Sequence, residues 1–288
     1  MSVTDRPRFA PDWLALREPA DATARAVGLL DPLREHLGLD RPRQQPVLVV
    51  RDLGCGSGSM GRWLAPRLRG PQHWVLHDHD AELLELAAAR MPRTGADGGR
   101  VTVSTRQGDI GRLTAAELSG TGLVTASALL DLLTHEEVDA LAAACAGAGC
   151  PVLLALSVAG RVELTPSDPL DGAIGGAFND HQRRLDHGRR LLGPDAVAAA
   201  RQVFAARGMD VLVGSSPWRL GAGDSALTAE WLRGWVGAAR EQRPDLAPRA
   251  TAYLRRRMEA CEAGELRVVV HHSDVLALPA AASAEAAA

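Results

Sequence analysis

The chain has 288 residues, of which 46% are hydrophobic and 23% are charged, and its formal net charge is −3 at pH 7. This length suits one large α/β domain with insertions, and the mildly acidic balance gives no broad electrostatic footprint for nucleic acid. No run of about eighteen apolar residues is present, and the first residues lack a secretion-signal pattern, so we expect a cytoplasmic protein that spans no membrane.

All 32 basic residues are arginines, a bias typical of a GC-rich, bacterial genome. Without lysine, the chain cannot contain a Schiff-base lysine, a P-loop lysine or the Tyr-x-x-x-Lys pair of short-chain dehydrogenases. The four cysteines have neither Cys-x-x-Cys nor paired-histidine spacing; they are Cys55, Cys145, Cys150 and Cys261. We therefore expect reduced thiols and no structural zinc.

The predicted elements begin with a helical pattern over residues 20–37, within an N-terminal helical segment, residues 1–44. Apolar runs then alternate with helical stretches, which is typical of βαβ units and a parallel sheet. Seven strands are expected, near residues 47–52, 73–78, 101–104, 122–126, 151–157, 209–214 and 266–272. They place the main domain at residues 45–279, and the alanine-rich residues 280–288 are expected to be a disordered tail.

The first strand runs into a glycine-rich loop, VLVVRDLGCGSGSMG, at residues 47–61. This pattern predicts a buried strand that turns sharply into a helix N-terminus, where backbone N–H groups can receive a nucleotide or an amino-acid cofactor. Glycines at 54, 56 and 58 permit positive φ and a close approach of the ligand. Gly56, Gly58 and Gly61 also satisfy the dinucleotide fingerprint G-x-G-x-x-G, so NAD is an alternative at this point.

The segment Asp52-Leu53-Gly54-Cys55-Gly56-Ser57-Gly58 resembles motif I of the class I S-adenosylmethionine (SAM) dependent methyltransferases, because the acid that ends the strand stands two residues before the first glycine. The resemblance implies SAM as the cofactor. It also implies an α/β, Rossmann-like, seven-stranded and mostly parallel sheet in the order 3-2-1-4-5-7-6, with helices on both faces. The loop residues that it assigns to the cofactor are Asp52, Gly54, Cys55, Gly56 and Gly58.

Three later landmarks follow in the order of the same family. Asp78 ends the second strand, beside His79, and a carboxylate there can accept hydrogen bonds from both ribose hydroxyls of SAM or NAD. The family uses a Gly-Asp pair after the third strand for the adenine, so the resemblance assigns Asp109 and Ile110 to that ring. Ser127 ends the fourth strand, on the loop that borders methionine and acceptor in the family.

Two insertions, residues 159–194 and 216–264, exceed the minimal fold and are expected to carry acceptor specificity, because ligands of open α/β sheets bind outside the carboxyl ends of the strands. The second insertion should add two helices that form a small helical cap with the N-terminal helix. Substrate-binding residues are predicted in the N-terminal segment and in both insertions: Trp13, Arg17, Asn179, Arg184 and Trp218.

Two polar clusters each allow two interpretations. Four arginines at residues 183–190 could bind a phosphate or carboxylate, or could form a solvated face. The sequence His-Asp-His-Asp at residues 77–80 resembles a metal-binding cluster, but neighbouring residues of a strand point to opposite faces, so we expect no metal.

Three residues are candidates for catalysis. His181 is the first choice for a general base, because a neutral imidazole can take a proton from the acceptor at pH 7; the alternative is a surface histidine on a polar helix. Asp131 and His135 follow the fourth strand, where the alternative is an ordinary helix start with Thr134 as the cap and Glu137 three residues later.

The function predicted from these patterns is the transfer of a methyl group from SAM to a small-molecule acceptor, at oxygen or nitrogen more often than at carbon. The chain would mainly align the acceptor with the donor and exclude water. It could act alone or as a homodimer, without nucleic acid or membrane. The alternatives are an RNA methyltransferase, or a SAM-binding protein without methyl transfer.

Overall fold

The computed structural model describes residues 10–39, 46–108 and 113–280. The predicted adenine residues Asp109 and Ile110 and the expected tail from residue 281 onward lie outside these ranges.

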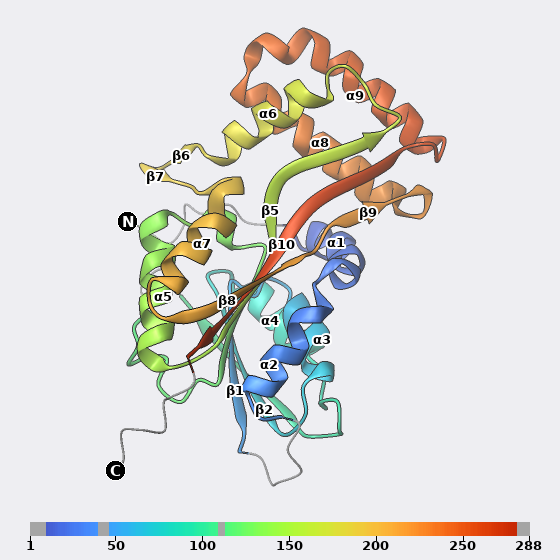
Figure 1. Ribbon diagram of the computed structural model, residues 1–288. Helices are drawn as coiled ribbons and strands as arrows, with labels where there is room; N and C mark the ends of the chain where they lie inside the picture. The colour runs from blue at the N-terminus through green and yellow to red at the C-terminus, as the bar shows by residue number, and fades with distance from the viewer. Residues whose placement is uncertain (1–9, 40–45, 109–112, 281–288) are drawn as a thin grey trace.

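A mostly parallel sheet forms the centre of the molecule (Figure 1), with the strands in the order β3-β2-β1-β4-β5-β10-β8. The strands are β1 (Leu48–Leu53), β2 (Gln72–Asp78), β3 (Val101–Gln107), β4 (Leu123–Ser127), β5 (Val152–Thr165), β8 (Met209–Ser215), β9 (Trp218–Leu220) and β10 (Arg267–Pro279). The last strand, β10, is antiparallel to β5, β8 and β9. Counting the seven main strands in chain order, the predicted arrangement 3-2-1-4-5-7-6 is confirmed.

Helices cover both faces of the sheet. One apolar core joins α2 (Leu30–His36), α3 (Ser59–Leu64) and α4 (Ala81–Arg90) to the sheet, and a second joins α5 (His135–Ala148) and α7 (Ala196–Ala205) to the opposite face. The alternation along β5 decides this division: Leu153 belongs to the first core, whereas Val152 and Leu154 belong to the second.

Strands β5 and β10 extend well beyond the sheet, to a last pair between Thr165 and Arg267. The expectation that β5 ends near residue 157 is wrong, and β10, expected at residues 266–272, continues through the sheet to Pro279. Gly160 interrupts the apolar run of β5 at an irregularity in the pairing with β10, and its φ of +70° is one that glycine adopts easily. Asn179 Nδ2 donates to the Gly160 carbonyl oxygen at 2.7 Å, and the strand continues beyond this point into the cap.

A helical layer packs on these strand extensions (Figure 1). It contains α6 (Asp171–Gln182), α8 (Ser225–Gln242) and α9 (Ala247–Glu262), which share an apolar core with the outer parts of β5 and β10. After α6 the chain forms a short hairpin, β6 (Leu185–Asp186) and β7 (Arg189–Arg190). None of the helices in the described ranges is long and apolar enough to cross a membrane.

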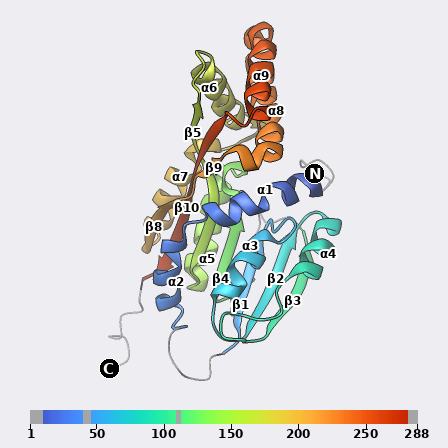
Figure 2. The same cartoon turned by 90° about the vertical axis from the view of Figure 1, so that its right-hand side faces the viewer.

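The N-terminal segment is two helices rather than the single helix expected over residues 20–37. The first, α1 (Pro11–Ala24), lies across the carboxyl edge of the sheet beneath the cap (Figure 2), and α2 follows after a turn. The break has a tertiary cause. The buried Asp274 of β10 accepts hydrogen bonds from Ala26 N at 2.8 Å and from Leu156 N at 2.7 Å, which fixes the chain at the end of α1.

Replacing Asp274 should therefore destabilise the protein strongly. Asp274→Ala leaves two backbone N–H groups without their acceptor, and each such group costs about 1–3 kcal/mol when it stays buried. We expect urea unfolding to give a free energy of unfolding lower by about 2–5 kcal/mol. The matched control is Asp210→Ala, at an exposed position of β8. An equal loss in both variants would contradict this role of Asp274.

Candidate functional site

The loop from β1 to α3 has the left-handed backbone that its glycines predict. The φ angles are +58° at Gly54, +52° at Gly56 and +86° at Gly58. A Cβ atom at Gly58 would lie 3.0 Å from the Cβ of Ala87, so this glycine lets α4 approach the loop. Residues 54–57 line a cavity at the carboxyl edge of the sheet, and Gly58 is not among the lining residues.

Asp78 connects the end of β2 to this loop. Its Oδ2 accepts a hydrogen bond from Gly56 N at 2.8 Å, and its Oδ1 accepts one from Asp80 N at 3.0 Å. The Nδ1 atom of His79 lies 3.2 Å from Asp78 Oδ1. Asp78 and His79 line the same cavity as the loop. Each carboxylate oxygen can accept more than one hydrogen bond, so Asp78 retains acceptor capacity toward the cavity.

Asp52 lies beneath the loop and not in the cavity wall. It is fully buried, and its Oδ1 accepts a hydrogen bond from Thr125 Oγ1 at 2.7 Å. Burial raises the pKa of Asp52 to about 7, although the Thr125 hydroxyl and the Arg25 guanidinium oppose this shift. Asp52 therefore supports the loop from below.

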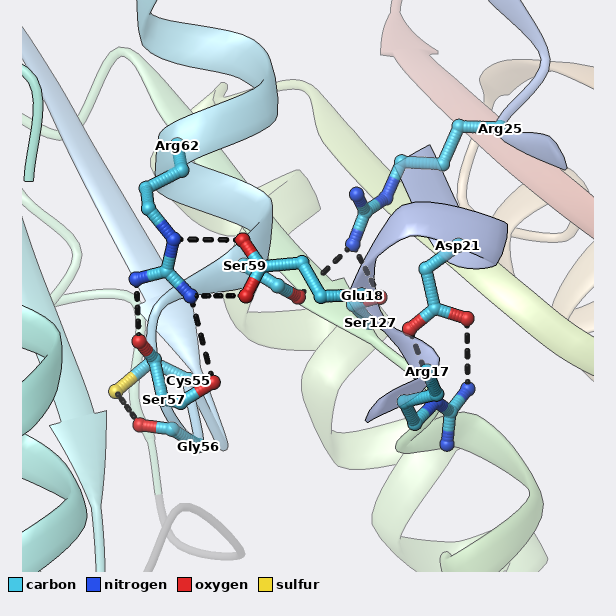
Figure 3. A network of polar contacts seen from close by, with 10 residues as sticks. All are labelled: Arg17, Glu18, Asp21, Arg25, Cys55, Gly56, Ser57, Ser59, Arg62 and Ser127. Carbon is cyan, nitrogen blue, oxygen red and sulfur yellow. Dashed lines mark hydrogen bonds and ion pairs between the residues drawn. The ribbon is translucent and has the colours of Figure 1, made fainter. Parts of the chain in front are cut away.

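Helix α1 is fastened to the loop by a polar network (Figure 3). Arg62 Nε and Nη2 donate to the two carboxylate oxygens of Glu18, each at 2.6 Å, and Arg62 Nη1 donates to the Ser57 carbonyl at 2.5 Å. At the other end of α1, Arg25 Nη2 donates to Ser59 Oγ at 3.1 Å and to Ser127 Oγ at 3.2 Å. These contacts make α1 a wall of the cavity.

No pattern in the sequence singles out Arg25 and Arg62, the two arginines of this network. Arg25 binds Ser59 and Arg62 binds Glu18, and the two partners lie 34 and 44 residues apart in the chain. Arg25 is only 2% exposed, although an arginine at the end of a helix is usually exposed to solvent. Only the tertiary contact shows that their guanidinium groups turn inward.

Much of the remaining cavity wall comes from α1, from the loop after β4 and from the β6–β7 hairpin with its flanking residues. Its side chains are Leu14, Arg17, Asp21, Leu129, Leu132, Leu133, Arg184, Asp186, Arg189 and Leu191. Of the residues predicted to bind substrate, Arg17 and Arg184 thus line the cavity.

The other predicted substrate residues lie elsewhere. Trp218 is buried, and its Nε1 donates to Asp21 Oδ1 at 2.9 Å, while the Arg17 guanidinium carbon lies 5.0 Å from a ring centroid of Trp218. Trp13 meets Trp218 edge-on at 6.4 Å. Asn179 bonds to the backbone of β5. These side chains support α1 and the cap.

The three catalytic candidates are not brought together. His181 lies on α6, with Nε2 3.3 Å from Glu241 Oε2 of α8, and does not line the cavity. Burial, together with the Arg184 charge, lowers the pKa of His181. His135 is exposed at the start of α5, where Thr134 and Glu137 form the capping box considered as the alternative.

Asp131 does not line the cavity itself, but it lies between residues that do. It lies in a short 3₁₀ helix (Leu130–Leu132), and its neighbours Leu129 and Leu132 line the wall. Burial raises the pKa of Asp131, against the opposing charge of Arg17. In the described ranges, no three His, Cys, Asp or Glu side chains are grouped to hold a metal ion.

Comparison with known proteins identifies the domain that holds this loop. Residues 50–148 match a family model described as a methyltransferase domain. These residues are therefore similar to a methyltransferase domain, which agrees with the predicted SAM-dependent methyltransferase and favours SAM over a dinucleotide at the glycine loop.

Solved structures of similar shape include a cyclopropane synthase from Mycobacterium tuberculosis, with 13% identity over 93% of this chain and 94% of that chain at a TM-score of 0.45. A SAM-dependent methyltransferase from Thiobacillus denitrificans in complex with S-adenosylhomocysteine (SAH) has 17% identity over 94% of this chain and 99% of that chain, at a TM-score of 0.41. No curated protein matches the chain.

The glycine loop and the ends of β2 and β4 offer groups with which SAM could interact. The glycine backbone is open to the cavity, and a Cβ at Gly54 would lie only 3.1 Å from Leu129 Cδ1, so larger residues would crowd this wall. Asp78 and Ser127 offer a carboxylate and a hydroxyl on the same wall. This combination suits the ribose and the methionine ammonium of SAM.

Removing the Asp78 carboxylate should weaken SAM binding. Bonds to a charged acceptor contribute about 1.5–3 kcal/mol each, so we expect Asp78→Ala to raise the Kd for SAH about tenfold or more in titration calorimetry. Glu85→Gln, on the exposed face of α4, is the control and should bind SAH as the wild type does. NAD(H) should give no heat with any of the three proteins; heat with NAD and none with SAM or SAH would overturn the assignment.

Proposed function

We propose that the protein transfers a methyl group from SAM to a small-molecule acceptor, at oxygen or nitrogen. The observation that carries this proposal is that α1 and the β6–β7 hairpin cover the cavity; we call these two elements its roof. Helix α1 and the β6–β7 hairpin both contribute side chains to the wall beyond the cofactor residues, and Glu18 ties α1 to the loop. A site walled on these sides suits a compact acceptor better than a polymer.

This geometry suggests which role each group has in the reaction. SAM supplies a methyl group that its sulfonium already activates. The apolar wall side chains Leu14, Leu132 and Leu133 would exclude water, and Arg17 would orient the acceptor. Arg17 is itself held by two contacts to Asp21, at 2.9 and 3.2 Å, so its guanidinium has a fixed direction.

An acceptor that carries a proton needs a group to receive it, and Asp131 is our choice. His181 faces Glu241 and Arg184, and His135 is exposed at the start of α5. The carboxylate of Asp131 is the base, so activity should rise as the pH rises through its pKa, which burial places above that of an ordinary aspartate.

We therefore expect Asp131→Asn to lower kcat by about a hundred- to ten-thousand-fold without weakening SAH binding. The assay is SAH release from SAM in the presence of a low-molecular-weight metabolite extract, followed across pH. His135→Ala is the matched control and should retain its rate, and His181→Ala should lose far less than Asp131→Asn. A rate in Asp131→Asn within about twofold of the wild type would show that no base is needed there.

The RNA alternative has its own test. Two of the four arginines at residues 183–190 are paired with carboxylates of the protein, Arg183 with Asp195 at 2.6 Å and Arg189 with Glu137 at 2.6 Å, which leaves too few for the many phosphates of an RNA. We expect binding of total RNA to be weak and methyl transfer to the metabolite extract to change little between low and high salt. Tight RNA binding that weakens steeply with salt would favour the alternative. No SAH release with the extract or with RNA would favour a SAM-binding protein without methyl transfer.

A further inference from the structure

Three arginines line the part of the cavity formed by α1 and the β6–β7 hairpin, where the acceptor would bind, and two of them are paired with carboxylates of the protein. Arg17 is paired with Asp21. Arg189 is paired with Glu137 at 2.6 Å and faces Asp186 at 3.6 Å. Both guanidinium groups therefore have a carboxylate of the protein as counter-charge, and neither needs a ligand to neutralise it.

Arg184 is the exception. It follows the last turn of α6 and lines the cavity, half-buried. Its Nη1 donates to the His181 carbonyl oxygen at 3.2 Å and lies 3.5 Å from His181 Nδ1. Within the described ranges, no carboxylate forms an ion pair with Arg184. A guanidinium in a cavity wall is costly to desolvate without a counter-charge, so an anionic ligand would stabilise it.

His181 and Glu241 hold this guanidinium in place. The Nε2 of His181 faces Glu241 Oε2 at 3.3 Å, so Nε2 carries the proton and Nδ1 is the acceptor that faces Arg184. The lowered pKa of His181 keeps the ring neutral at pH 7, which avoids repulsion between the two side chains. The remaining donors of Arg184, Nε and Nη2, have no partner in the described part of the chain.

We propose that the methyl acceptor carries an anionic group, a carboxylate or a phosphate, that Arg184 binds, and that His181 is a positioning residue that directs Arg184. The inference rests on the proposed transfer to a small molecule and names the class of that molecule. It also gives His181 a role other than that of a base.

The test measures the binding of small anions to the protein saturated with SAH. The probes are benzoate, inorganic phosphate and benzamide, which has the shape of benzoate without its charge. We expect benzoate or phosphate to bind at least about tenfold more tightly than benzamide, and Arg184→Gln to remove this preference, because a bond to a charged group is worth about 1.5–3 kcal/mol. The preferred anion distinguishes a carboxylate from a phosphate on the acceptor.

Two controls separate Arg184 from its surroundings. Arg190→Gln changes an exposed arginine of the same hairpin and should leave anion binding unchanged. His181→Ala should weaken anion binding several-fold, and His181→Asn should restore most of it, because the amide oxygen can accept the same bond from Arg184. A side chain with only a packing role would not be rescued in this way.

Three results would overturn the inference. They are benzamide binding as tightly as both anions, equal effects of Arg184→Gln and Arg190→Gln, and a loss of SAH affinity in Arg184→Gln, which would assign Arg184 to the cofactor. Failure of the proposed function is recognised separately, since it would appear as wild-type protein that binds SAH but transfers no methyl group, or that does not bind SAH at all.

Discussion

The bond from Gly56 N to Asp78 Oδ2 is the contact on which the site depends. It joins the ends of β1 and β2, and it forms only because the glycines adopt left-handed backbone angles that other residues rarely reach. With the loop held in this way, its backbone faces the carboxyl edge of the sheet. The cavity, and every contact that closes it, is built on that surface.

The contacts that close the cavity come from helix α1, which precedes the glycine loop in the chain. Glu18 reaches Arg62, and Arg25 reaches the hydroxyls of Ser59 and Ser127, so α1 contacts both the glycine loop and the end of β4. Asp274 fixes the chain just after α1 by accepting from Ala26 N. The roof of the cavity is therefore set by buried polar bonds, which are directional, as well as by apolar packing.

The arginines that line the cavity differ in whether a carboxylate of the protein pairs with them. Arg17 and Arg189 serve as fixed parts of the wall because carboxylates of the protein neutralise them. Arg184 has the same chemistry and lacks that partner among the described residues, so its guanidinium is available to a ligand. The difference follows from the position of each arginine relative to an acid, and it is invisible in the clustered sequence of residues 183–190.

The sequence by itself determined the sheet, its strand order by resemblance, the glycine loop and the acid at Asp78, because these depend on local patterns: apolar runs, glycines that allow positive φ, and an acid at a strand end. The break after α1, the full length of β5 and β10 and the burial of Arg25 and Arg62 were decided only by the tertiary structure. The same holds for the placement of His181 away from the cavity wall. Each of these depends on a partner far away in the chain, such as Asp274 for Ala26 or Glu241 for His181, and no local pattern encodes such a pairing.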